Sequence, residues 1–129
     1  MHKSRLAAFV LDSQVSDIEQ ANKFWEQALG MPCVRSDEDW KDKYSSLETP
    51  VSQPNLLIQK VEHQSHIHLD IETDNIEAEV KRLLNLGASV HKKMERWVVM
   101  EAPTGHRFYV VQPQRSDFGS TGEVNQWDD

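Results

Sequence analysis

The chain has 129 residues, of which 38% are hydrophobic and 27% charged, and its 21 acidic and 14 basic residues give a formal net charge of -7. This length suits one compact domain, or two half-domains that share a core. No cluster of lysine and arginine accompanies the acidic balance, which argues against a nucleic-acid partner because DNA and RNA are bound by concentrated positive charge. No apolar stretch approaches the roughly 20 residues that a membrane span needs. We therefore expect neither nucleic acid nor membrane as a partner.

The N-terminal segment does not have the pattern of a secretion signal. Its apolar run, residues 6–11, is short, and Asp12 ends it before a small-residue cleavage site could follow. The single cysteine, Cys33, cannot form an internal disulfide, so nothing indicates an oxidising compartment. A cytoplasmic protein is expected.

The first half of the chain predicts a strand, a helix and three further strands. Residues 6–11 form a compact apolar run that is typical of a buried strand. Ser16 and Glu19 have the spacing of a capping box, in which both side chains bind the first helical amides. Apolar residues then recur at helical spacing as far as Leu29, and Gly30 favours the end of the helix. The three further strands are expected at residues 32–35, 44–47 and 56–61, with a charged loop over 37–43.

The second half repeats this order. Residues 66–71 read as a strand, Asp74 and Glu77 as a second helix cap, and Gly87 as the end of the second helix. Asp70 follows Asp12 at a spacing of 58 residues, and the residues around both positions align. Such self-similarity indicates a repeated structural unit. Three more strands are expected at residues 89–92, 97–100 and 107–111, with a turn at 103–105.

The last residues of the chain, 115–129, are polar and acidic and contain few apolar anchors. We expect this tail to be loose, as chain ends commonly are. The alternative is that Phe118 and Trp127 dock on a partner subunit.

A β-α-β-β-β unit that occurs twice in about 130 residues, with Leu-Gly closing each helix, resembles the vicinal oxygen chelate superfamily, and its glyoxalase-like and bleomycin-resistance members in particular. The segments that carry the resemblance are Phe24–Gly30, His68–Asp74 and Trp97–Phe108. It implies an α+β fold in which two βαβββ modules form a cupped mixed sheet. The glyoxalase-like domain would cover residues 1–114, with modules at about 5–61 and 65–113, before the tail over 115–129.

The resemblance also implies positions for a metal site, because metal-using members carry ligands on the first, fourth, fifth and eighth strands. In this sequence those positions fall on Val10, Gln59, His68 and Tyr109. Valine has no donor atom, and neutral glutamine and tyrosine are weak or rare ligands for a divalent cation. We therefore predict that these positions hold no metal and that the domain has no other cofactor.

The same positions are candidates for ligand binding. His68 is either an acid/base group in the pocket or a core histidine. Asp12 and Asp70 lie two residues beyond Val10 and His68, on the same strand faces; they are either pocket carboxylates or structural hydrogen-bond acceptors. Trp97, like Trp40, either stacks on a planar ligand or packs in the core. The full predicted set is Val10, Asp12, Gln59, His68, Asp70, Trp97 and Tyr109.

Three histidines, His63, His66 and His68, also have a spacing that could hold zinc or nickel. Only the last two share a strand face, and the pattern signals no fourth donor. We favour loop and strand histidines without a metal.

Two functions remain open. The first is binding of a small aromatic or cationic organic molecule without a metal, and the excess of acidic residues favours a cationic guest. The second is a lyase or isomerase of the vicinal oxygen chelate type, with or without a divalent metal, in which His68 is the acid/base and Tyr109 the hydrogen-bond donor to a developing oxyanion. The resemblance further implies a homodimer.

Overall fold

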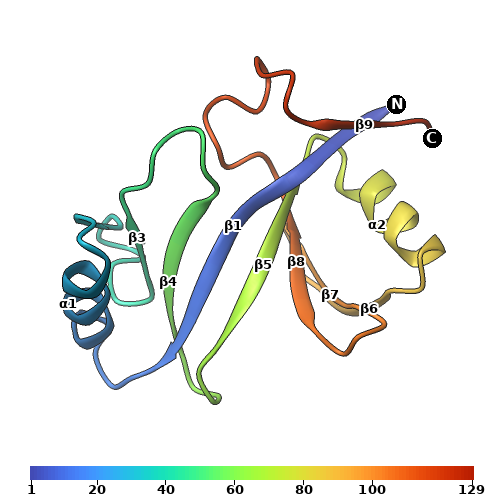
Figure 1. Ribbon diagram of the computed structural model, residues 1–129. Coiled ribbons are helices and arrows are strands. Elements are labelled where there is room, and N and C mark those ends of the chain that lie inside the picture. The colour runs from blue at the N-terminus through green and yellow to red at the C-terminus, as the bar shows by residue number, and fades with distance from the viewer. The chain divides into compact units, whose positions relative to one another are not determined.

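A computed structural model describes all 129 residues (Figure 1). The chain forms nine strands and two helices, which are β1 (His2–Gln14), α1 (Ile18–Leu29), β2 (Cys33–Arg35), β3 (Tyr44–Leu47), β4 (Asn55–Val61), β5 (His66–Thr73), α2 (Ile76–Asn85), β6 (Ser89–Lys93), β7 (Val98–Glu101), β8 (Arg107–Val111) and β9 (Asn125–Trp127). The order of β1 to β8 confirms the α+β fold with two βαβββ modules that the sequence predicts. By contact, the chain divides into residues 8–67, which we call the first module, and residues 1–7 with 68–129, which we call the second module.

In the first module, β1 pairs in parallel with β4, and β4, β3 and β2 follow as antiparallel neighbours (Figure 1). Helix α1 packs against one face of these strands. The buried side chains between them are Leu11, Ile18, Ala21, Leu47 and Ile58. Since successive strand residues point to opposite faces, Val10, Asp12 and Gln59 lie on the face away from α1.

The second module repeats the arrangement. Strand β5 pairs in parallel with β8, and β8, β7 and β6 follow as antiparallel neighbours (Figure 1). Its core lies under α2 and consists of Leu83, Val98, Met100, Phe108 and Val110. The alternation of side chains therefore puts His68, Asp70 and Tyr109 on the face away from α2.

The strand register shows that the two modules are built on the same plan. Asp12 lies opposite Gln59 in the β1–β4 pair, and Asp70 lies opposite Tyr109 in the β5–β8 pair. The two aspartates that align at a spacing of 58 in the sequence thus occupy equivalent places in their modules.

Both helix caps lie one residue later than the sequence predicts. The carboxylate of Asp17, rather than the hydroxyl of Ser16, accepts an amide of the first helical turn, that of Glu19, at 3.0 Å. In α2 the cap is Asn75, whose side chain accepts from Ala78, while the carboxylate of Asp74 accepts the amide of Lys3. Each pattern offers two adjacent capping residues, and the backbone path into the helix decides between them.

Substitution of the two α1 candidates tests this assignment. We expect Asp17→Ala to lower the free energy of unfolding by about 1 kcal/mol, because it removes the side chain that caps the helix. Ser16→Ala should change it by no more than about 0.5 kcal/mol, since this exposed hydroxyl contacts only Gln20, at 3.3 Å. Chemical denaturation of both variants measures the difference, and equal losses would contradict the assignment.

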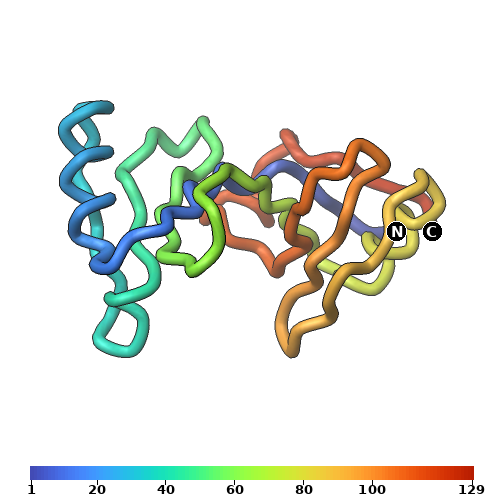
Figure 2. The backbone as a smooth tube through the Cα atoms, turned by 90° about the horizontal axis from the view of Figure 1, so that it is seen from below, coloured from blue at the N-terminus to red at the C-terminus, as the bar shows by residue number.

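The C-terminal residues are ordered, so the expectation of a loose tail is wrong. Strand β9 pairs antiparallel with the start of β1, His2 to Trp127 and Ser4 to Asn125. The indole of Trp127 donates to the hydroxyl of Ser4 at 2.8 Å, and Phe118 is 6% exposed. The two ends of the chain lie side by side (Figure 2), and the amino group of Met1 is 3.2 Å from a carboxylate oxygen of Asp129. Both aromatic anchors are thus held by their own chain.

Neither helix has the length and apolar character required to cross a lipid bilayer.

Candidate functional site

Three of the predicted site residues come together on the sheet face of the second module that points away from α2. The imidazole of His68 stacks on the ring of Tyr109, with centroids 4.1 Å apart and planes 20° from parallel. Its Nε2 lies 3.3 Å from Oδ1 of Asp70, the residue opposite Tyr109 in the strand pair. His68 and Asp70 are buried, at 3% and 7% exposed, whereas Tyr109 is partly exposed. We call these three residues the His68 cluster.

The strands explain why these side chains meet. His68 and Asp70 are two residues apart on β5 and so share a face, and the parallel partner β8 presents Tyr109 beside them. A carboxylate beside an imidazole can hold the ring in one orientation. A tyrosine hydroxyl adds a hydrogen-bond donor. Chemically, the cluster combines a group that can transfer protons with a flat aromatic surface that is partly accessible.

The predicted residues of the first module have different surroundings. Val10 is 3% exposed, and the side-chain amide of Gln59 donates to the hydroxyl oxygen of Tyr44 at 3.3 Å. The ring of Tyr44 in turn contacts Trp40 edge to face, with centroids 5.6 Å apart. Trp40 is thus part of an aromatic pair on β3 and the loop before it.

Trp97 does not join the His68 cluster. It lines a pocket of about 410 Å³ beside α2, together with Ile76, Val80, Lys93 and Arg96. None of the residues of the His68 cluster lines that pocket. The structure therefore separates Trp97 from the other predicted residues of its module.

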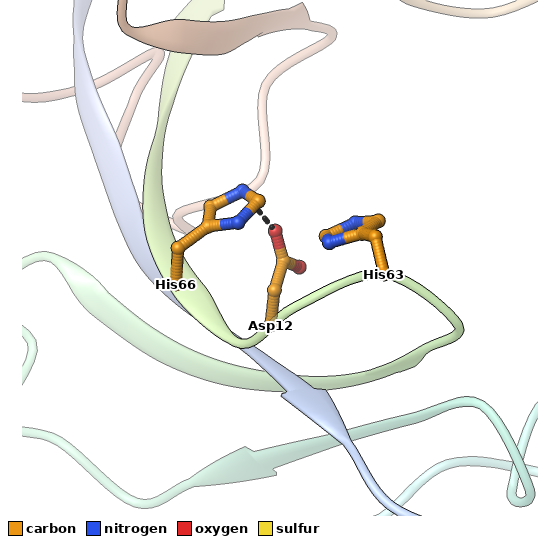
Figure 3. A group of neighbouring side chains, drawn as sticks. All are labelled: Asp12, His63 and His66. Atoms are coloured by element: carbon orange, nitrogen blue, oxygen red, sulfur yellow. Dashed lines mark ion pairs between the residues drawn. The ribbon is translucent and has the colours of Figure 1, made fainter.

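A second polar cluster lies in the first module, formed by Asp12, His63 and His66 (Figure 3). Nε2 of His66 is 3.1 Å from Oδ2 of Asp12, which is 5% exposed. The rings of His63 and His66 stack, with centroids 4.7 Å apart. One potential ligand atom of each residue lies within 4.8 Å of the other two. The histidine pattern in the sequence thus contributes only two of its three members, and Asp12 takes the place of His68.

Hydrogen bonds donated by Gln14 explain how this cluster forms. The backbone amide of Gln14 donates to the hydroxyl of Ser65 at 2.8 Å, and its side-chain amide donates to the carbonyl of Glu62 at 2.9 Å. The loop that carries His63 is therefore attached to the end of β1, next to Asp12. Sequence spacing could not reveal this contact, because it joins the end of β1 to a loop about 50 positions later in the chain. The only signal in the sequence was that polar residues at a strand end accompany a histidine-rich loop.

The cluster opens onto a pocket of the first module with a volume of about 390 Å³. Asp12 and His66 line it together with Phe24 and Trp25 of α1 and with Ile67. Phe24 and Ile67 are 60% and 59% exposed, so the pocket has large apolar side chains at its surface.

Residues 8–111 match the sequence profile of the family described as glyoxalase-like domain. Because this match covers most of the chain, the protein belongs to the glyoxalase-like domain family, within the vicinal oxygen chelate superfamily. No curated protein matches the sequence.

Solved structures agree with this fold at low sequence identity. A Legionella pneumophila protein described as an NAD-dependent benzaldehyde dehydrogenase superimposes with a TM-score of 0.63 at 10% identity, covering 83% of this chain and 98% of that one. Methylmalonyl-CoA epimerase from Mycobacterium tuberculosis gives 0.56 at 16% identity, with 84% and 87% covered. Homoprotocatechuate 2,3-dioxygenase from B. fuscum gives 0.54 at 15%, with 90% of this chain but only 35% of that one covered. At such identities the likeness concerns the fold alone.

The residues at the superfamily's metal positions do not fit a divalent cation. Val10 offers no donor atom, and Gln59 is hydrogen-bonded to Tyr44. His68 lies face to face with Tyr109. A cation would need three or four nitrogen or oxygen donors in a closed shell, and this set supplies one histidine with two weak donors.

Proposed function

We propose that this glyoxalase-like protein binds a small aromatic or cationic organic molecule at the His68 cluster, without a metal at the superfamily's positions. The observation that supports the proposal most is the stacked pair of His68 and Tyr109. The ring of Tyr109 is partly exposed, and the buried carboxylate of Asp70 lies beside the ring of His68. Aromatic and cationic guests bind to such ring surfaces. Asp70 and the net charge of -7 favour a positively charged guest.

Binding of probe molecules tests this proposal. Thermal-shift and NMR titrations would use benzylamine as an aromatic cation and benzyl alcohol as its neutral analogue. We expect saturable binding of benzylamine that weakens at least about tenfold in His68→Asn, since the substitution removes the ring that supports Tyr109. His106→Asn, in the exposed turn before β8, is the matched control and should bind like the wild type. Equal affinity of both variants for the probe would refute the assignment of the site.

The contact between His68 and Asp70 supports a second candidate function, proton transfer next to a carbonyl. His68 would take the proton, Asp70 would hold the ring, and the hydroxyl of Tyr109 would donate to the developing oxyanion. The measurement is exchange of deuterium from solvent into small 2-oxo acids, followed by NMR. This candidate requires exchange that is lost in His68→Asn and reduced in Tyr109→Phe; no exchange above background by the wild type would eliminate it.

A further inference from the structure

We propose that the first module binds one divalent transition-metal ion through the carboxylate of Asp12 and one ring nitrogen each of His63 and His66. These residues are separate from Val10, Gln59, His68 and Tyr109, at which the superfamily's metal site is expected. The potential ligand atoms already lie within 4.8 Å of one another. Two imidazoles and a carboxylate form a donor set that suits zinc, nickel, cobalt or ferrous iron, whereas magnesium and calcium prefer oxygen ligands alone.

The hydrogen bonds of the histidines favour metal binding. Nδ1 of His66 donates to the carbonyl of Gln64 at 3.2 Å, and Nδ1 of His63 donates to the same oxygen at 2.9 Å. Histidines that ligate metals typically donate their second ring N–H to such an acceptor, which fixes the tautomer and the ring orientation. A neutral ring with its proton on Nδ1 keeps the lone pair of Nε2 free for a metal.

The contact between His66 and Asp12 requires a proton or a metal ion between the two side chains. Nε2 of His66 faces Oδ2 of Asp12 at 3.1 Å, and two lone pairs at this distance repel unless a proton or a metal ion lies between them. A proton would be shared by these two atoms only. A metal ion would also use His63, which stacks on His66 and has no role in a simple two-residue ion pair. The position of the third residue therefore favours the metal.

The different burial of the three ligands is suited to closing the site. Asp12 is buried and fixed by the pairing of β1 with β4, whereas His63 and His66 are exposed side chains on and beside an attached loop. Bonds of about 2.0–2.2 Å to a zinc ion place tetrahedral donors about 3.3 Å apart. His66 and Asp12 already have this spacing, at 3.1 Å, so the ligand that must move inward is His63, by roughly an ångström, which is the range of a small change in side-chain torsion.

Three protein ligands leave at least one position for water or for an oxygen of a bound molecule. Because Asp12 and His66 line the pocket of about 390 Å³, a bound ion would lie at its polar edge, in a pocket that the apolar Phe24 and Ile67 also line. The site would accept a small molecule that joins an oxygen donor to an apolar group. This inference does not depend on the function proposed for the His68 cluster.

The test uses the full chain without a histidine tag, freed of metal with a chelator. Isothermal titration with zinc and absorption titration with cobalt should both show one equivalent bound, and the cobalt bands should report nitrogen and oxygen ligands. We expect His63→Ala and His66→Ala each to weaken zinc binding at least about tenfold. His91→Ala and His106→Ala, which remove exposed histidines of the second module, should leave it unchanged.

Three outcomes would overturn the proposal. One is no saturable binding of zinc or cobalt at micromolar concentration, which would leave the proton as the group between His66 and Asp12. Another is binding that persists in both His63→Ala and His66→Ala. The last is loss of binding in His68→Ala with retention in His66→Ala, which would place the metal at the superfamily's positions. Circular dichroism of each variant confirms folding, and both tested histidines are exposed, so loss of the fold would not mimic loss of the metal.

Discussion

Replacement of Glu72 by alanine is expected to lower the free energy of unfolding by about 3–5 kcal/mol, the range for breaking a buried ion pair. Glu72 has no exposed surface, and one carboxylate oxygen accepts the Nε–H of Arg5 at 2.7 Å. The other accepts the backbone amides of Gln114 and Arg115 at 2.6 and 2.9 Å. The substitution leaves a buried guanidinium and two backbone donors without their acceptor, and each of these losses costs free energy.

Glu101 provides a matched control in the same module. It pairs with Arg107 at 2.9 Å, but both side chains are more than 40% exposed. Glu101→Ala should therefore cost less than about 1 kcal/mol. Urea denaturation measures both variants, and equal midpoints would show that the buried pair contributes no more than the exposed one.

The Glu72→Ala substitution should also loosen the C-terminal residues. Arg5 also donates to the carboxylate of Asp117 at 2.6 Å, and its guanidinium lies 5.7 Å from the ring centroid of Phe118. When Glu72 is lost, Arg5 loses the partner that orients it toward both. Limited proteolysis should therefore cleave the Glu72→Ala variant within residues 112–124 under conditions in which the wild type and Glu101→Ala remain intact.

The repeated modules could be predicted because their signals are local. Each helix has an apolar stripe, a capping pattern and a terminal glycine, and Gly30 has the left-handed conformation, with φ of 65°, that the pattern requires. The strands β3 and β8 have the predicted bounds, Tyr44–Leu47 and Arg107–Val111. The repetition at a spacing of 58 added a second, independent copy of the same evidence.

The features that escaped prediction depend on contacts between distant residues. Strand β9 is short and polar, and its pairing partner is the opposite end of the chain, so no local period announces it. The cluster of Asp12 with His63 and His66 depends on Gln14 holding a loop about 50 positions later. By contrast, His68, Asp70 and Tyr109 could be grouped, because strand alternation and the repeat together place them on one face.

The second large loss of stability is expected when Glu79 is replaced, because this residue is fully buried between two basic side chains. Its carboxylate accepts a hydrogen bond from Nε2 of His2 at 2.8 Å and forms an ion pair with Arg82 at 2.7 Å. Glu79→Ala should cost about 3–5 kcal/mol, because it leaves His2 and Arg82 without their buried counter-charge. Glu77→Ala, on the exposed face of the same helix, is the control and should cost no more than about 0.5 kcal/mol.

The Glu79 network also predicts how stability changes with pH. Burial lowers the pKa of His2, but hydrogen bonds to Glu79 and Asp129 outweigh it, so the pKa of the folded state is raised above the ordinary 6.5. A group with a raised pKa contributes its full stability below the pKa of the unfolded state and loses it as the pH rises through the folded value. Wild-type stability should therefore fall as the pH rises above 6.5. In His2→Gln this fall should be smaller, and the difference between the two denaturation profiles isolates His2 from other groups that titrate in the same range. Parallel profiles would show that folding does not change the pKa of His2, and a wild-type profile that rises relative to that of His2→Gln would show that burial lowers it.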